Sequence, residues 1–130
     1  MVRPSSEKPT ELELQFLKIL WENAPRPVRE IRDALAESGR DIAHTSVITT
    51  LNTMVEKGYL KRTKDGNAFL FSPAVTQNDV SQQMLGDIVD RVFDGSPSAV
   101  VLSLFECSDI DDEELKELRR IFNRKAKEQK

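Results

Sequence analysis

The stretch that decides the fold is HTSVITTLNTMVEKGYLKRTKDGNAFLFSP, from His44 to Pro73. In its first half, apolar residues recur at helical spacing and turn four threonines towards other faces. These apolar residues are Val47, Leu51, Met54 and Val55. Gly58 then ends the predicted helix. In the second half, two runs of aromatic, leucine and threonine residues bracket Lys64-Asp65-Gly66-Asn67, where Asp-Gly favours a tight turn. The sequence therefore predicts a helix that leads into a β-hairpin.

Two further helices are predicted before this stretch. Thr10 and Glu13 have the spacing of a capping box, in which each side chain satisfies a backbone N–H group at the start of a helix. The second helix is predicted from Val28 to about Glu37, and residues 26–28 can form a short strand that pairs with the hairpin. Three helices followed by a hairpin are the order of a winged helix-turn-helix, a fold that is mainly α with a small β-hairpin wing.

The residues after Pro73 predict three more amphipathic helices, of which the second begins at Ser96-Pro97 and the third at Asp111 with Glu114. Their apolar faces are too large for so short a segment to bury within itself, which favours a symmetric homodimer. The alternative is that these helices fold back on their own winged helix. The residues predicted to form the dimer interface are Met84, Leu85, Ile88, Val89, Val92, Phe93, Val101, Leu104, Phe105, Leu115, Leu118, Ile121 and Phe122.

The chain is thus predicted to have three regions: a flexible N-terminus (1–8), a winged helix domain (9–73) and a three-helix dimerisation domain (74–130). The net charge of −3 divides unevenly, with +1 in residues 1–73 and −4 in residues 74–130. Locally, the segment from Lys57 to Lys64, at the end of the helix and the start of the hairpin, carries four basic residues and no acidic one. A positive patch can therefore exist on an acidic protein, although a solvated hairpin with scattered charges explains the same residues.

The composition argues against several other classes of protein. With one cysteine, Cys107, and one histidine, His44, the chain cannot build a disulfide framework and has too few ligands for a conventional transition-metal site. We read His44 as a helix-start residue or a phosphate donor, and expect no metal or cofactor. An enzyme is the least supported class, since no nucleophile–base arrangement or glycine-rich phosphate loop is present. No apolar run is long enough for a bilayer and no signal peptide is evident, so we expect no membrane association and a location in the cytoplasm.

Residues 9 to 125 resemble a known family. The segments that carry the resemblance are PTELELQFLKILWENAP, HTSVITTLNTMVEKGYLKR and AFLFSPAV, in this order and followed by a three-helix tail. They are similar to the penicillinase and methicillin-resistance repressors of the BlaI/MecI family, which has copper-responsive repressors as cousins. The copper-responsive branch has a cysteine-rich C-terminal motif, which this chain lacks.

The resemblance implies a dimeric bacterial transcriptional repressor in which each winged helix binds half of a dyad operator in double-stranded DNA. It places base-reading positions on Thr45 and Ser46, and backbone contacts on Thr49, Thr50, Arg62, Lys64 and Asn67. The physical reading agrees, because short hydroxyl side chains in the major groove can meet either hydrogen-bonding edge and the Thr45 methyl group can pack on thymine. The best-known members have lysine in place of Thr45 and a polar or basic residue in place of Ile48, so their operator sequence should not be transferred to this protein.

The resemblance also implies a route to derepression. In the proteolysed branch of the family, a sensor-activated protease cuts the short helix after the "GS" turn, which corresponds to the Leu104–Phe105 bond. This chain has Leu104 where that branch usually has asparagine, and the alternatives are a different inducer or no proteolytic step. For the whole protein, the alternative function is a winged helix that binds other proteins and does not read DNA; steep salt dependence would distinguish a DNA reader.

Overall fold

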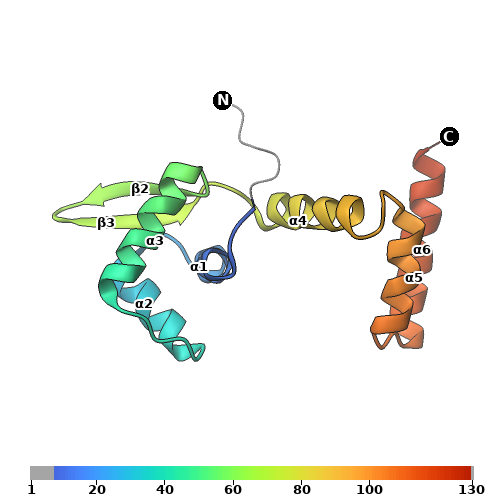
Figure 1. Cartoon of the computed structure of the whole chain (residues 1–130), viewed down its shortest axis with the longest axis horizontal. Helices are drawn as coiled ribbons and strands as arrows, with labels where there is room; N and C mark the ends of the chain where they lie inside the picture. Colours follow the sequence, from blue (N-terminus) through green and yellow to red (C-terminus); the bar gives the residue numbers. More distant parts are fainter. Residues whose placement is uncertain (1–7, 130) are drawn as a thin grey trace. The chain divides into compact units, whose positions relative to one another are not determined.

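The structure is a computed structural model that describes residues 8–129. Along these residues the elements are α1 (Glu11–Glu22), β1 (Arg26–Pro27), α2 (Val28–Glu37), α3 (His44–Lys57), β2 (Leu60–Asp65), β3 (Ala68–Pro73), α4 (Gln77–Arg91), α5 (Pro97–Cys107) and α6 (Asp112–Glu128) (Figure 1). The predicted fold class, mainly α with a small β-hairpin wing, is confirmed. The flexible N-terminus predicted for residues 1–8 lies outside the described residues except for Lys8. The chain divides into two compact units, one ending at Asp87 and the other beginning at Ile88.

Local signals set the ends of the helices as the sequence predicts. The hydroxyl oxygen of Thr10 accepts the backbone N–H of Glu13 at 3.2 Å, and the Glu13 carboxylate accepts that of Thr10 at 2.9 Å. This reciprocal pair is the predicted capping box. Gly58 ends α3 with a φ of 90°, which places it in the left-handed region that glycine adopts without steric cost.

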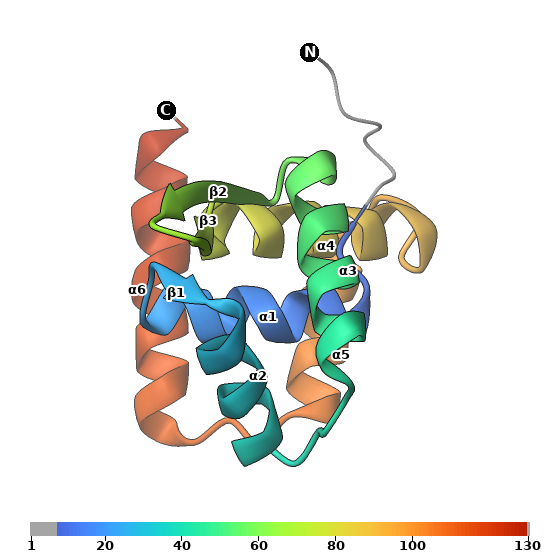
Figure 2. The same cartoon turned by 90° about the vertical axis from the view of Figure 1, so that its left-hand side faces the viewer.

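The three strands form one antiparallel sheet in the order β1-β3-β2. Arg26 pairs with Phe71, which confirms the predicted short strand before α2. The ladder between β2 and β3 continues to the pair Asp65 and Ala68, so the connecting loop consists only of residues 66–67. This loop is shorter than the predicted turn, because Lys64 and Asp65 stay in the ladder. The hairpin projects from the group formed by α1, α2 and α3 (Figures 1 and 2).

A single apolar core joins α1, α2, α3 and the hairpin. The side chains in it that are almost completely buried are Phe16, Leu17, Leu20, Ile31, Leu35, Val47, Leu51, Met54, Tyr59, Leu60, Phe71 and Val80. The predicted stripe on α3 is confirmed at Val47, Leu51 and Met54, whereas Val55 is half-buried at its edge. Because all three helices contribute to it, this core stabilises the two-stranded hairpin, which would be marginal alone.

The first turns of α4 belong to this first unit. Val80 is buried in its core, and Met84 is half-buried against it. The indole N–H of Trp21 donates to the carbonyl oxygen of Val75 at 2.9 Å, which fixes the segment that leads into α4. The compact unit therefore extends to Asp87, beyond the boundary predicted after Pro73. Met84, which the sequence assigned to the dimer interface, contacts the core of its own chain.

In the second unit, α5 and α6 are antiparallel helices (Figure 2). Both begin as predicted: the Ser96 hydroxyl accepts the backbone N–H of Ala99, and the Asp111 carboxylate accepts that of Glu114. Neither helix contains a buried residue. Large apolar side chains exposed in or near this unit are Leu85, Ile88, Val92, Leu102, Leu104, Phe105, Leu115, Ile121 and Phe122. Four other predicted interface residues, Val89, Phe93, Val101 and Leu118, are half-buried.

Candidate nucleic-acid interface

The outward face of α3 is made of short hydroxyl side chains. Because the buried residues Val47, Leu51 and Met54 hold the opposite face of α3 in the core, the residues between them point away from it. Those at the start of the helix line a shallow, open hollow of about 270 Å³: they are Thr45, Ser46, Thr49 and Thr50. The structure thus brings together the four α3 positions that the resemblance assigned to DNA. His44, the first residue of the helix, is exposed beside them.

The N-terminus of α3 lacks both a side-chain cap and an acidic residue in its first turn, whereas each of the other helices described has at least one of them. Its N-cap residue is Ala43, which provides no side-chain hydrogen bond, and its first turn contains no acidic residue. The start of α3 therefore keeps the positive end of its helix dipole and backbone N–H groups that no described side chain caps. Such a helix end favours a negatively charged group such as a phosphate.

The hairpin presents Arg62 towards α3. Residues of β2 alternate between two faces of the sheet, so Arg62 lies on the same face as the buried Leu60. The Arg62 guanidinium donates a hydrogen bond from Nη1 to the side-chain oxygen of Asn52 on α3 at 2.6 Å. It also lies over the ring of Phe69, 4.7 Å from the ring centroid, in a cation–π contact. Two contacts therefore fix the direction of the Arg62 side chain beside α3.

The remaining predicted contacts of the hairpin lie nearer its tip. Lys64 is on the same face of β2 as Arg62 and pairs with Phe69 on β3, and its side chain is exposed. Asn67 is an exposed residue of the two-residue loop. Lys61 is exposed on the opposite face of the strand. The hairpin thus has cations on both faces, an arrangement suited to a phosphate backbone.

An ion pair holds the C-terminal end of α3. The Nζ atom of Lys57, the last residue of α3, lies 2.9 Å from Oε2 of Glu13 on α1. Glu13 is only 4% exposed, and its other oxygen is the one in the capping box. One carboxylate thus caps the start of α1 and anchors the end of α3. The sequence predicted the first role but not the second, because the two residues are 44 positions apart.

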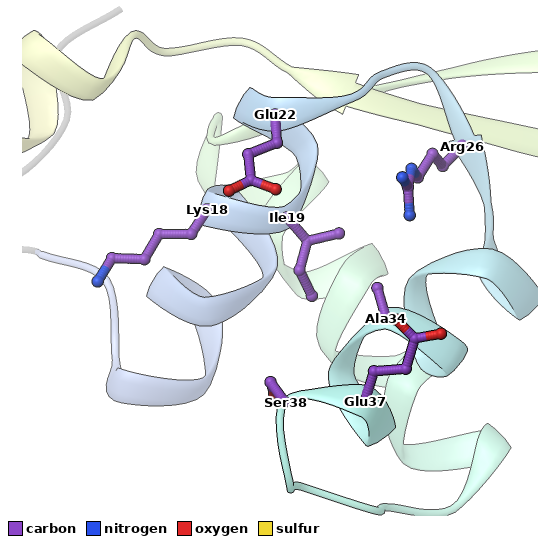
Figure 3. A pocket seen from close by; sticks show the side chains of 7 residues that line it. All are labelled: Lys18, Ile19, Glu22, Arg26, Ala34, Glu37 and Ser38. Carbon is purple, nitrogen blue, oxygen red and sulfur yellow. The ribbon is translucent and has the colours of Figure 1, made fainter.

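A second hollow, of about 410 Å³, lies between α1, α2 and β1. Glu22 and Glu37 lie on two sides of it, Arg26 lies on a third, and the ammonium group of Lys18 extends away from the others (Figure 3). Two carboxylates beside one guanidinium disfavour a phosphate, so this hollow is not part of the candidate interface.

Among residues 8–129 no group of three or more potential ligands could hold a metal ion, and no helix is long and apolar enough to cross a membrane.

Comparison with known proteins agrees with this geometry. The sequence model of the penicillinase repressor family matches residues 9–124. The chain belongs to the penicillinase repressor family. It is 25% identical to the methicillin resistance regulatory protein MecI of Staphylococcus aureus strain Mu50, over 87% of this chain and 91% of that protein. It is 24% identical to the penicillinase repressor of Bacillus licheniformis, over 87% of this chain and 88% of that protein.

The winged helix is also found in a solved structure of the family. The DNA-binding domain of the repressor BlaI superposes with a TM-score of 0.51 at 20% identity, over 60% of this chain and 93% of that domain. At this identity the likeness shows the fold alone.

The sequence did not identify Asn52 and Phe69 as contacts of Arg62. The sequence signals for these contacts were positional: Asn52 lies five residues before the end of α3, and Phe69 lies on the strand opposite Arg62.

Proposed function

We propose that this protein is a transcriptional repressor that binds a dyad operator in double-stranded DNA as a homodimer. As a member of the penicillinase repressor family it is a DNA-binding regulator, and two recognition helices would read the two halves of the operator. The observation that carries the proposal is the exposed hydroxyl face at the uncapped start of α3, next to the fixed cation Arg62. Short polar side chains at the start of a helix fit the major groove, and the hairpin cations fit the adjacent phosphates.

The homodimer is supported by the apolar surface of the second unit. Val92 is 66% exposed and Leu102 is 64% exposed. Exposed apolar side chains that recur along three successive helices form the type of surface that an interface between subunits covers. A second copy of the chain offers the same surface, so a two-fold symmetric interface would cover both.

Relief of repression by proteolysis remains a prediction from the family resemblance. Leu104 and Phe105 lie in α5 and are 45% and 40% exposed in the single chain. A sensor-activated protease that cut between them would separate α6 from the rest of the dimerisation unit. The two winged helices would then lose the gain in affinity that comes from holding two half-sites together. A location in the cytoplasm, with access to the chromosome, is part of the same proposal.

The proposal is tested by equilibrium binding of the full-length protein to duplex DNA as salt increases. Sites would first be selected from random duplexes, and enrichment of a dyad with half-sites about one helical turn apart, or a multiple of it, is expected. Affinity should fall with a log–log slope of about −0.9 for each phosphate neutralised. If no sequence is enriched and affinity for DNA is weak at every salt concentration, the winged helix is a protein-interaction module instead.

Mutations should separate the two parts of the interface. Thr45→Ala and Ser46→Ala should relax base preference, because these residues face the bases. Arg62→Ala and Lys64→Ala should weaken binding to all sequences alike, and each should make the salt slope shallower by about one per subunit, or about two for the dimer. Hairpin variants that change base preference while nonspecific affinity is unchanged would reverse these assignments.

A further inference from the structure

The recognition face of α3 lacks the side chains that read bases in pairs of hydrogen bonds. Arginine or lysine binds guanine, and asparagine or glutamine binds adenine, through two hydrogen bonds in the major groove. The four residues that line the hollow on α3 instead end in hydroxyl groups, three of them accompanied by a methyl group. From His44 to Thr53, the only amide side chain of α3 is that of Asn52.

Asn52 is already engaged. Its side-chain oxygen accepts the 2.6 Å hydrogen bond from Arg62, so one of its two lone pairs is used within the chain and the amide is held towards the hairpin while that contact is kept. The hydroxyl of Thr53 donates to the carbonyl oxygen of Thr49 at 2.9 Å, which also uses a polar group of this helix within the chain. The groups that remain available are the hydroxyl and methyl groups of the hollow.

Among the four bases, only thymine presents a methyl group in the major groove. We propose that the recognition helix selects thymine by packing the methyl groups of Thr45 and Thr49 against the C5-methyl groups of bases in each half-site. This inference rests on the proposed function and specifies how the same site reads its operator. It assigns Thr49 to a base, whereas the family resemblance places this residue on the DNA backbone.

The spacing of the two threonines fits neighbouring bases. Thr45 and Thr49 are four residues apart on one helix face, where Cβ atoms are about 5–6 Å apart. Bases on one strand are about 3.4 Å apart along the helix axis, so the two methyl groups span one or two base steps. Ile48 is half-buried between them and adds further apolar surface at the edge of this face.

The first test changes only the DNA. A site selected from random duplexes by the full-length protein is resynthesised with deoxyuridine in place of each thymidine in turn, which removes one methyl group and keeps every hydrogen-bonding group. At one or two thymines in each half-site, we expect affinity to fall about fourfold per methyl group. Substitution at other thymines is the matched control and should leave the dissociation constant unchanged.

The second test combines the deoxyuridine substitution in the DNA with substitutions of Thr45 and Thr49 in the protein. Thr45→Ser and Thr49→Ser remove the methyl group and keep the hydroxyl, whereas Thr45→Val and Thr49→Val keep a methyl group and remove the hydroxyl. A homodimer has the change in both half-sites, so each serine variant should lose about fourfold per half-site, or about 16-fold in total, on the thymine site. It should show no further loss on a site that has deoxyuridine at the matching position of both half-sites. The valine variants should retain the preference for thymine over deoxyuridine.

The outcomes separate this inference from the proposed function. If a dyad is enriched but no deoxyuridine substitution weakens binding, thymine methyl groups are not read and the inference fails, while the repressor assignment stands. The same holds if the valine variants lose the preference and the serine variants keep it, because hydrogen bonds then carry the selection. If no sequence is enriched at all, the proposed function fails together with the inference.

Discussion

The two units of this protein use the same kind of helix in opposite ways. In the first unit the apolar faces of α1, α2 and α3 meet in one core, and residues such as Phe16 and Leu51 are completely buried. In the second unit α5 and α6 are equally regular and well capped, yet neither contains a fully buried residue. The amphipathic pattern of a sequence therefore shows that a helix has a partner, but not whether the partner is in the same chain.

The strongest test of this difference is to separate the units. A chain ending after Asp87 should be folded and monomeric, because Val80 and Met84 still cover the first unit. Its operator affinity should fall about 10²–10⁴-fold, because the two half-sites are no longer bound by one linked molecule. Sedimentation and operator titration measure the two effects.

A shorter chain ending after Pro73 is the matched control. It lacks Val75, whose carbonyl accepts the Trp21 hydrogen bond, and also Val80 and Met84. It should therefore be less stable to denaturant than the chain ending after Asp87. If either truncated chain is still dimeric, the interface lies in the first unit and the comparison is wrong.

Matched leucine substitutions in the two units come next in size. Leu51→Ala should lower the free energy of unfolding of the first unit by about 2–5 kcal/mol, because it leaves a cavity in a packed core. Leu102→Ala, at a residue that is 64% exposed, should leave the first unit unchanged. Denaturant titration of the chain ending after Asp87 measures the first effect, and titration of the full-length protein measures both. A loss of first-unit stability in Leu102→Ala would show that the units fold together.

A smaller effect is expected from Glu13→Gln, which tests how the recognition helix is anchored within the first unit. Glutamine still accepts the Thr10 hydrogen bond of the capping box but loses the ion pair to Lys57. The free energy of unfolding should fall by about 1.5–3 kcal/mol, the range for a hydrogen bond to a charged group. Glu11→Gln is the control, because the Glu11 side chain is 90% exposed and its ion pair with Arg40 is long, at 3.9 Å. Equal effects of the two substitutions would assign no special role to the buried pair.

The smallest effect concerns the contact between Asn52 and Arg62. Asn52→Ala should weaken DNA binding about two- to tenfold, since Arg62 must then be ordered during binding. The charge is kept, so the salt slope should stay the same, whereas Arg62→Ala should make it shallower by about one per subunit, or about two for the dimer. A changed slope in Asn52→Ala would contradict the role of a positioning residue.

The features predictable from the sequence are those set by neighbouring residues. Thr10 with Glu13, Gly58 and Ser96 each decide a helix end within four positions of the chain, and the structure confirms them. The order of helices and hairpin follows from such local signals, and so does the exposed face of α3, because the residues opposite Val47 and Leu51 on a helix must point outward.

The remaining features depend on how elements pack. The contact of Lys57 with Glu13 and that of Arg62 with Asn52 join residues that no periodicity relates. The packing of Met84 also depends on distant residues. Its apolar side chain predicts burial but does not identify the surface that covers it. For this reason the sequence did not indicate that the first compact unit continues to Asp87.

The uncapped start of α3 places a limit on protein engineering. Ala43→Asp would add a cap and raise the free energy of unfolding by about 1 kcal/mol, so a selection for heat resistance would favour it. The same carboxylate would occupy the helix end that is proposed to face DNA phosphates, and would repel them. Thermostability and operator affinity should therefore trade against each other at this one position, and an evolved, heat-resistant variant should be screened for repression before it is kept.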